Sequence, residues 1–310
     1  MDILSKSNAI KSLASSFGFD ACGIAKAKEL SEHATHLKSW LEKGYHADMH
    51  WMANHFEKRI NPANLVEGAK SVIVVLKNYS PKEFPFEQQK LKISRYALGK
   101  DYHDVVKLKL KQLLDQINQQ MGPINGRCFV DSAPVMEKSW AVEAGLGWIG
   151  RNSLLLNKSL GSYFFIGEII IDIELSYDTP IKPFCGTCTA CITACPANAI
   201  VSPSIIDSKR CISYHTIENK GEIPEIVSEN MNGWVFGCDI CQEACPWNKK
   251  LHSHQEVEFE PIQGMIEIKD NDWASLNESE FNIIFKNSAI KRTGYAGMMR
   301  NTSVSLNEPH

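Results

Sequence analysis

A run of four closely spaced cysteines constrains this chain more than any other feature. It begins at Cys185 and ends at Cys195-Pro196, with the spacing C-x2-C-x2-C-x3-C-P. This is the bacterial ferredoxin pattern for [4Fe–4S] clusters, in which three cysteines hold one cluster and the fourth ligates a second. The segment must therefore wrap around an inorganic cluster, and more cysteine ligands are expected elsewhere in the chain.

A second cysteine set completes this expectation. Cys238, Cys241 and Cys245-Pro246 follow the spacing C-x2-C-x3-C-P, which is the first motif without its leading cysteine. Cys211 lies alone upstream and is the candidate for the missing ligand. The two-cluster rule then predicts that the sets exchange their fourth ligands. The predicted ligands of the first cluster are Cys185, Cys188, Cys191 and Cys245, and those of the second are Cys195, Cys211, Cys238 and Cys241.

Two structural zinc sites are the alternative, because C-x2-C pairs also bind zinc. One tetrahedral zinc does not need a third and fourth thiolate so close in sequence, so the spacing favours clusters. The remaining cysteines, Cys22 and Cys128, stand in apolar, strand-like stretches, and we expect both to be buried core residues.

Composition limits the class of protein. The chain has 310 residues, enough for two domains, and its net charge of −3 leaves only a local basic patch as a nucleic-acid surface. Its longest apolar stretch, Tyr163–Leu175, is interrupted by Glu168 and Asp172 and is too short to span a bilayer. No signal peptide follows Met1, so we expect a cytoplasmic protein without a membrane partner. Ten cysteines in that compartment indicate redox or metal chemistry in preference to disulfides.

Hydrophobic periodicity predicts mixed helices and strands before the first cysteine. The clearest amphipathic helix is 101–120, and the β-branched run 71–76 predicts a strand buried on both faces. Further helices are expected at 5–17, 29–44, 48–56 and 134–145, and further strands at 21–25, 92–96, 127–130, 153–156 and 162–173. Because these elements do not alternate regularly, we predict an α+β domain over residues 1–176. A metal-held domain over 177–250 and a helical segment over 251–310 would follow it.

Longer motifs link the chain to a known family. They are Ser94–His103 (SRYALGKDYH), Val130–Lys138 (VDSAPVMEK), Ala144–Asn152 (AGLGWIGRN) and the split cysteine set that ends in Pro246-Trp247-Asn248. With these motifs the chain resembles the epoxyqueuosine reductases, which are cobalamin-dependent iron–sulfur enzymes that modify tRNA, over nearly its whole length. The resemblance implies a nitroreductase-like α+β domain and a ferredoxin-like two-cluster domain, with base-off cobalamin between them. A short helical tail would stand where many relatives carry a HEAT-like domain.

The resemblance also implies a reaction. The epoxide oxygen of epoxyqueuosine would leave as water from the wobble position of tRNAs for Asp, Asn, His and Tyr, which have GUN anticodons. Two electrons from an external low-potential donor and two protons are needed, and the enzyme would act as a monomer. Candidate phosphate contacts near the clusters are Lys209, Arg210, Lys249, Lys250, Arg292 and Arg300.

Asp131 matches the family's proton donor. The epoxide oxygen must be protonated as its C–O bond breaks, and a carboxyl group with a raised pKa can do this at neutral pH. The alternative is that Asp131 only caps the next helix, which is common for Asp ahead of Pro134. The residues that the resemblance assigns to cobalamin are Arg59, Tyr96, Tyr102, His103, Asp131, Arg151, Ser153 and Asp239.

Two other functions fit part of the pattern. A corrinoid reductive dehalogenase would use similar machinery on a small organohalide, although the respiratory kind carries an export signal. A non-catalytic electron-transfer protein would need the two clusters and only a docking function for the first domain. Bound cobalamin and the surroundings of Asp131 would distinguish an enzyme from this last class.

Overall fold

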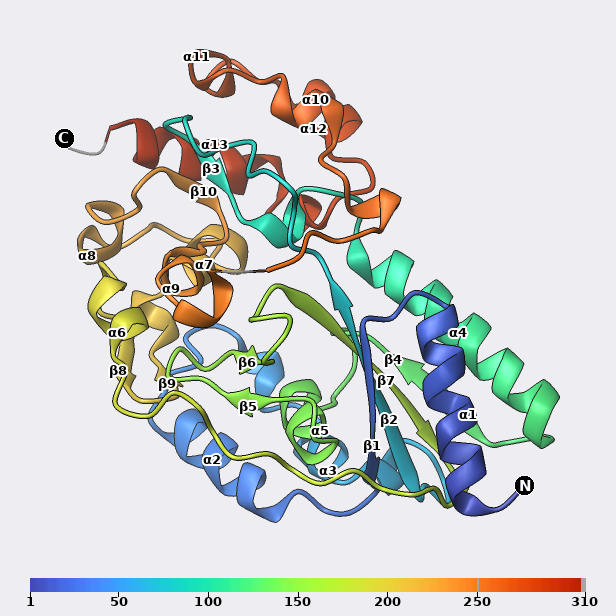
Figure 1. The fold of residues 1–310 in the computed structure, drawn as a ribbon. Coiled ribbons are helices and arrows are strands. Elements are labelled where there is room, and N and C mark those ends of the chain that lie inside the picture. Colours follow the sequence, from blue (N-terminus) through green and yellow to red (C-terminus); the bar gives the residue numbers. More distant parts are fainter. Residues whose placement is uncertain (250, 308–310) are drawn as a thin grey trace.

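A four-stranded antiparallel sheet lies at the centre of the molecule (Figure 1). The computed structural model describes residues 1–249 and 251–307. The strands, in sheet order, are β1 (Ala21–Lys26), β2 (Ser71–Asn78), β7 (Phe164–Ile171) and β4 (Gly126–Phe129). Every residue of β2 is buried, which confirms the prediction made from its β-branched sequence.

Helices cover both faces of this sheet. On one face, α1 (Ile3–Ser16) and α4 (Tyr102–Met121) pack against the side chains of β7 that include Phe165 and Ile169. On the other face, α5 (Glu137–Glu143) packs against Ile170 and its neighbours. The two apolar cores follow from the alternation of side chains along each strand. The predicted helix 101–120 is confirmed, and its apolar stripe is buried.

Several predicted elements are shorter than expected. The predicted helix 48–56 is wrong, because the chain there forms a 3-10 turn, and α3 begins only after His55, whose φ of 55° is left-handed. The predicted helix 134–145 begins later than expected, at Glu137. The predicted strand 92–96 stops after two residues and becomes the 3-10 turn η3. The elements that complete this part are α2 (Ser31–Glu42), η1 (His50–Met52), α3 (Phe56–Ile60), η2 (Pro62–Asn64), β3 (Lys92–Ile93), η3 (Arg95–Ala97), β5 (Trp148–Ile149) and β6 (Leu155–Leu156).

The cysteine-rich part consists of short elements joined by turns. Its elements are α6 (Ala190–Ala194), β8 (Ile200–Ser202), β9 (Ile205–Ile206), η4 (Ser208–Arg210), α7 (Ile212–Ile217), α8 (Glu225–Ser228), β10 (Trp234–Phe236), α9 (Ile240–Glu243) and η5 (Pro246–Asn248). Apolar side chains of this part form a small core that includes Ile212, Val227 and Trp234.

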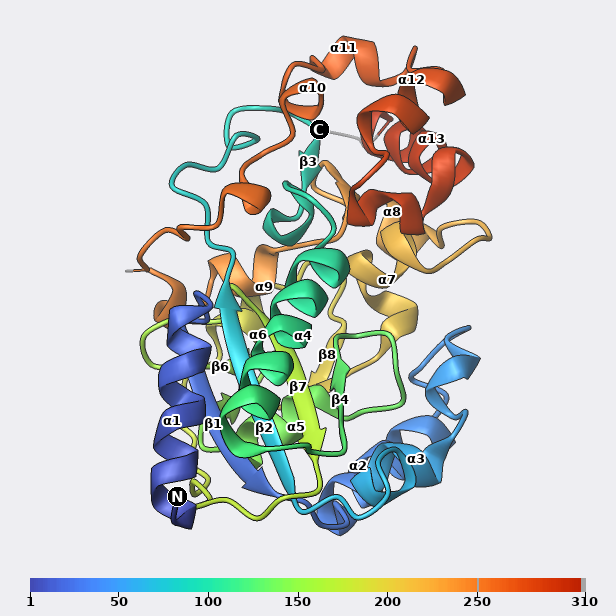
Figure 2. The ribbon, with the colours of Figure 1, turned by 90° about the vertical axis from the view of Figure 1, so that its right-hand side faces the viewer.

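The C-terminal segment packs at one end of the molecule (Figure 2). It comprises η6 (Val257–Phe259), α10 (Gln263–Ile266), α11 (Asp270–Trp273), α12 (Glu278–Ile284), η7 (Ala289–Arg292) and α13 (Gly294–Leu306). Its apolar side chains share one core with Phe86, Ile93 and Phe236. Because β3 also pairs in parallel with β10, the region around residues 84–98 joins the three parts of the chain.

The fold therefore has the mixed helix and sheet content that the sequence predicts. Neither in residues 1–249 nor in 251–307 is there a helix with the length and apolar character needed to cross a membrane.

Candidate active site

The first predicted cysteine group lines one cavity. Cys185, Cys188, Cys191 and Cys245 surround a space of about 240 Å³ together with Arg151 and the aromatic rings of Phe184 and Trp247. The short helix α6 carries Cys191, and η5 begins directly after Cys245. In the described part of the chain, no three Cys, His, Asp or Glu side chains are placed to hold a single metal ion.

The second predicted group is also brought together. Cys195 ends α6, Cys211 precedes α7, and Cys238 and Cys241 flank the start of α9. Burial raises the pKa of the Cys241 thiol, and the nearby thiols of Cys211 and Cys195 raise it further. Cys191 has the same effect on Cys241, so the two groups adjoin. The exchange of fourth ligands between two clusters stays a prediction.

Two hydrogen bonds already reach the sulfur atoms. Trp148 Nε1 donates to Cys185 Sγ at 3.4 Å, and the Ala199 amide donates to Cys195 Sγ at 3.3 Å. Hydrogen bonds to cysteine sulfurs adjust the reduction potential of iron–sulfur clusters. Neither donor was assigned from sequence, although Trp148 lies in the AGLGWIGRN motif.

Cys22 and Cys128 lie apart from both groups, against the core beneath α1 and α4. They are half-buried, so the prediction that they are fully buried is only partly correct. Burial raises the pKa of each thiol to about 12. Both are therefore protonated at neutral pH.

Asp131 is presented at the end of β4 in an unusual conformation. Its φ of 44° is left-handed, which is uncommon for a residue other than glycine and often marks a functional position. Its side chain is 61% exposed, and Oδ2 accepts a hydrogen bond from the Tyr102 hydroxyl. The residue that caps α5 is Met136, so the alternative role of Asp131 as a helix cap is wrong.

The start of α4 supplies the other groups around Asp131. Asp101 accepts a hydrogen bond from the His103 amide and caps the helix, and the same carboxylate oxygen lies 2.7 Å from His103 Nδ1. His103 Nε2 lies 3.8 Å from Asp131 Oδ2. The Tyr102 ring is stacked between Phe165, at 4.2 Å, and His103, at 4.1 Å. Helix capping and ring stacking thus fix the side chains that face Asp131.

A pair of acid and amine side chains lies near Asp131. Burial and the charge of Asp131 raise the pKa of Glu137 to about 8. Lys138 is exposed and donates to the Ser153 carbonyl at 2.8 Å. The charges of Glu137 and Asp131 both act on Lys138, so the three side chains form one group.

Glu168 lies on β7, near enough to Glu137 and Asp131 to be influenced by their charges. It is fully buried, faces the α5 side of the sheet opposite Phe129, and neither carboxyl oxygen has a hydrogen-bond partner. Burial, and then the nearby Glu137 and Asp131, raise its pKa far above that of an ordinary carboxyl, so Glu168 is neutral. The only sequence signal was the interruption of an apolar strand by one acidic residue.

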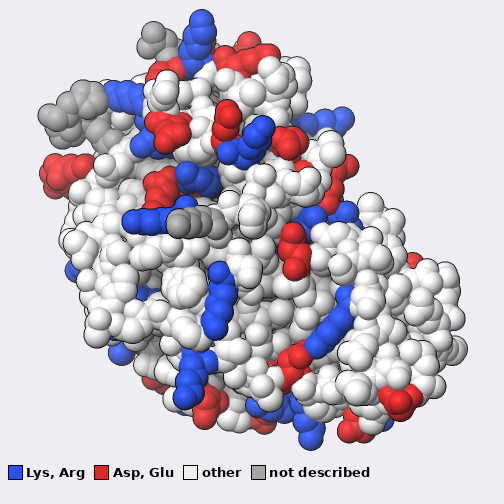
Figure 3. All heavy atoms as spheres, in the orientation of Figure 1, with Lys and Arg blue, Asp and Glu red and all other residues white. Residues whose placement is uncertain are grey.

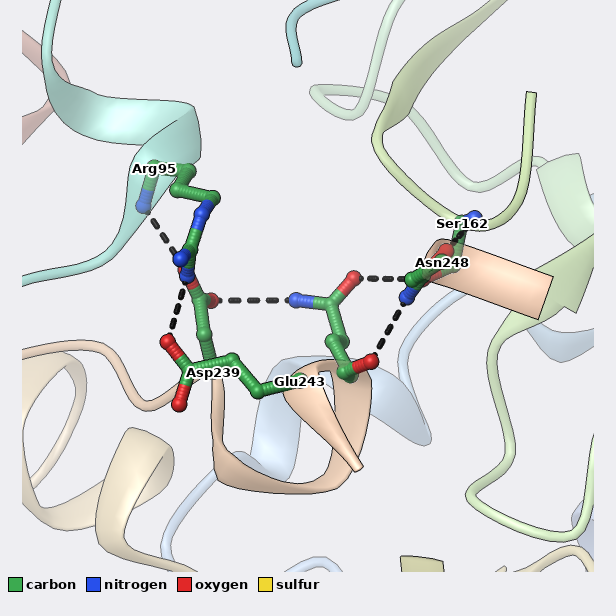
Figure 4. A network of polar contacts seen from close by, with 6 residues as sticks. Arg95, Ser162, Asp239, Glu243 and Asn248 are labelled. Atoms are coloured by element: carbon green, nitrogen blue, oxygen red, sulfur yellow. Dashed lines mark hydrogen bonds and ion pairs between the residues drawn. The ribbon is translucent and has the colours of Figure 1, made fainter. Parts of the chain in front are cut away.

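A polar network connects the second cysteine group to the first domain (Figure 4). Asp239 Oδ2 accepts from the Arg95 amide at 2.9 Å and from its guanidinium at 3.2 Å, and Oδ1 accepts from Gln242. Gln242 accepts from the Ser162 hydroxyl, which in turn accepts from Asn248. Both oxygens of Asp239 thus interact with protein groups.

The residues assigned to cobalamin fall into separate places. Tyr96 contacts the Tyr102 ring and so belongs with His103 and Asp131. Arg59 is buried, donates to the carbonyls of Trp51 and Asn54, and lies near Glu137. The Ser153 carbonyl accepts a hydrogen bond from Lys138, whereas Arg151 lines the first cysteine cavity and donates to the Gly186 carbonyl. Asp239 lies in the network described above.

Basic and acidic residues are interspersed on the face shown in Figure 3. Of the candidate phosphate contacts, Arg300 donates to the carbonyls of His215, Asn219 and Gly221, so it holds the protein together. Arg292 is exposed, pairs with Glu218 at 2.9 Å, and is close enough to Asp131 to be influenced by its charge. Lys209, Arg210 and Lys249 are exposed, and Lys250 lies outside the described residues.

Comparisons with known proteins agree with this arrangement. Residues 59–132 match a family model described as epoxyqueuosine reductase QueG, DUF1730, and residues 184–248 match a 4Fe-4S double cluster binding domain. The epoxyqueuosine reductase of Cyclobacterium marinum is 51% identical, with 96% of both chains covered. That of Synechocystis is 44% identical, with 92% of this chain and 99% of the relative covered.

Solved structures give the same result. An epoxyqueuosine reductase crystallised with an epoxyqueuosine-modified tRNA-Tyr stem loop superposes with a TM-score of 0.90 at 28% identity, covering 98% of this chain and 82% of that chain. The enzyme from Streptococcus thermophilus superposes with a TM-score of 0.86 at 26% identity, covering 96% and 80%. The chain belongs to the epoxyqueuosine reductase family of oxidoreductases.

Proposed function

We propose that this protein reduces epoxyqueuosine to queuosine at the wobble position of the tRNAs for Asp, Asn, His and Tyr. Cobalamin would be the cofactor, two [4Fe–4S] clusters would supply electrons, and Asp131 would be the proton donor. The observation that carries the proposal is the placement of Asp131, exposed and left-handed, against the Tyr102 hydroxyl and beside the His103 imidazole. Burial raises the pKa of Tyr96, and the charges of Asp131 and Asp239 both raise it further, which links Asp131 to the side of the second cysteine group.

Glu137 and Lys138 fit a cofactor that is edged with primary amides. Such amides need both donors and acceptors, and Lys138 and Glu137 offer one of each. We assign Arg59 to a supporting role, because its guanidinium holds the turn next to Glu137. Bound there, cobalamin would supply a strongly reducing cobalt centre for cleavage of a C–O bond.

The protein's own contribution to the reaction is proton delivery and orientation. The Tyr102 hydroxyl donates to Oδ2 of Asp131, which leaves Oδ1 to carry a transferable proton. Transfer of that proton to the epoxide oxygen during C–O cleavage avoids an alkoxide leaving group. Stacking of Tyr102 on Phe165 fixes the hydroxyl, and hence the carboxyl, in one orientation.

The positions of the two cysteine groups support one direction of electron flow. Cys188 of the first group is exposed, which suits entry of electrons from an external low-potential donor. The second group adjoins the first through Cys191 and Cys241 and lies on the Tyr96 and Asp239 side. We therefore assign the second cluster to the position nearest the cofactor.

The tRNA would approach over Arg292, because this exposed guanidinium lies near Asp131 and a phosphate could compete for it with Glu218. The related enzyme crystallised with a modified tRNA-Tyr stem loop supports this class of substrate.

Mass spectrometry of an anticodon stem loop that carries epoxyqueuosine tests the function. Anaerobic protein with both clusters and cobalamin loaded, together with a low-potential reductant, should convert the stem loop to a product that lacks one oxygen atom. Protein reconstituted without cobalamin is the control and should leave the substrate unchanged. An unchanged substrate with fully loaded protein would contradict the proposal.

A further inference from the structure

We propose that His103, held by Asp101, returns a proton to Asp131 within each turnover; this inference rests on the proposed function. The chemistry calls for such a group. Removal of an epoxide oxygen as water consumes two electrons, from the low-potential donor, and two protons, whereas a single carboxyl group carries only one. Asp131 must therefore be reloaded before the oxygen leaves as water.

The geometry at the start of α4 identifies the group that reloads it. His103 lies beside Asp131, with Nε2 3.8 Å from Oδ2. The Tyr102 hydroxyl is nearer, but burial and the charge of Asp131 raise its pKa, so Tyr102 keeps its proton. One water between Nε2 and the exposed carboxyl group can carry the proton across this distance. On the opposite side of the ring, Nδ1 lies 2.7 Å from Asp101 Oδ1, so Nδ1 keeps its hydrogen and Nε2 exchanges the proton. His103 is partly exposed, so the ring can be recharged from solvent.

The proton steps balance as follows. Asp131 gives its proton to the epoxide oxygen as the first C–O bond breaks, and becomes a carboxylate. His103 then transfers its Nε2 proton to that carboxylate and becomes a neutral imidazole. Asp131 donates again as the oxygen leaves as water, and solvent returns the protons to Nε2 of His103 and to Asp131.

The surrounding charges favour a cationic His103. Burial acts to lower its pKa, but the hydrogen bond and charge of Asp101, followed by Asp131 and Asp104, raise it above the ordinary value. The Tyr102 ring stacks on the His103 imidazole. From η7, the charge of Lys291 acts on Asp101, and Arg292 interacts with the charge of Asp131. A proton donor must be protonated to act, so turnover should fall as the pH rises through the raised pKa of His103.

Three variants test this role at equal cluster and cobalamin content. His103→Gln keeps a hydrogen-bond donor but cannot titrate, so it should lower the turnover rate about 100-fold and remove the alkaline decline. Asp101→Asn should move that decline to lower pH, because it removes the charge that favours the imidazolium. His103→Ala should regain activity when imidazole is added. His36→Gln, an exposed change on α2, is the matched control and should behave like wild type.

A measurement independent of activity completes the test. The ¹⁵N NMR titration of the His103 ring in the loaded protein should show a pKa above 6.5 that falls in Asp101→Asn. The proposal is overturned if wild type converts the substrate while His103→Gln keeps its rate and pH profile, or if imidazole fails to rescue His103→Ala. Failure of wild type itself to convert the substrate would instead reject the proposed function.

Discussion

Asp131 and Glu168 each adopt an energetically unfavourable state that the rest of the fold avoids. Asp131 holds a left-handed backbone that costs on the order of 1–3 kcal/mol, and Glu168 places an unpartnered carboxyl group in the core. Costs of this kind usually persist at functional sites, because the surrounding fold compensates for them.

Glu168 gives a prediction about stability and pH. Its pKa is raised in the folded protein, so the folded state keeps a proton that the unfolded state releases above about pH 4.3. Stability should therefore decrease as the pH rises from 5 to 8, by up to about 1.4 kcal/mol per pH unit from this group. Glu168→Gln, which cannot ionise, should lose part of that dependence.

Thermal unfolding midpoints of the cluster-loaded proteins at pH 5 and pH 8 measure this effect. Relative to wild type, the unfolding midpoint of Glu168→Gln should be higher at pH 8 than at pH 5. The exposed change Glu174→Gln serves as the control and should follow wild type. Equal pH dependence in wild type and Glu168→Gln would mean that Glu168 is not neutral in the folded protein.

Residue patterns in the sequence predicted some of these roles and missed others. Local spacing predicts the two cysteine groups, and the ligand exchange between two clusters stays a prediction. The role of Glu168 was not, because its lack of a partner depends on α5 covering it from another part of the chain. His103 was placed near the cofactor, but its distances to Asp101 and Asp131 arise only when α4 and the end of β4 meet.

At the scale of elements, η3 and α9 are joined by a buried ion pair. Arg95 contacts Asp239, whose side chain is only 2% exposed. Burial raises the pKa of Asp239, and Arg95 opposes that rise, so the carboxylate depends on its partner. The same turn follows β3, which pairs with β10. This contact therefore positions the second cysteine group against the first domain.

Arg95→Met should destabilise the protein by about 3 kcal/mol, because it leaves the Asp239 charge buried without its partner. Combining Arg95→Met with Asp239→Asn should recover part of the loss, because no buried charge then remains. Urea unfolding of the loaded proteins measures both effects, with the exposed change Lys111→Met on α4 as the control. If Arg95→Met alone were as stable as wild type, the ion pair would not be what holds η3 and α9 together.

Element boundaries were the least predictable part of the fold. The apolar pattern near residues 48–56 is helical, yet the left-handed His55 divides it. The strand predicted at 92–96 ends early because Arg95 turns to meet Asp239, which is distant in sequence. Long elements such as α4 and β2 were predicted well, since their pattern extends over several turns or pairs.

For the molecule as a whole, the C-terminal segment contributes to the site as well as to the core. Its turn η7 brings Arg292 near Asp131, and α13 is tied to α7 and β10 by Asn301, whose amide donates to Thr216 and Val235. The predicted division into residues 1–176, 177–250 and 251–310 stays a prediction. The cores and strand pairs described here extend across those boundaries.

Arg292→Gln should weaken binding of the modified stem loop. If this guanidinium contacts one phosphate, its loss should reduce the slope of log affinity against log salt concentration by about 1. Fluorescence anisotropy over a range of salt concentrations measures the slope, and Lys107→Gln, exposed on α4, is the control. If the salt dependence of binding had the same slope as in wild type, Arg292 would not contact a tRNA phosphate.

The comparison of Asp131→Asn with wild type tests the central claim most directly. Both proteins should be loaded with two clusters and cobalamin to the same content, mixed with reduced donor and epoxyqueuosine stem loop, and followed by mass spectrometry. Wild type should remove one oxygen atom, and Asp131→Asn should do so at least about 100-fold more slowly, because it lacks the acid. Equal rates for the two proteins would contradict the assignment of Asp131 as the proton donor.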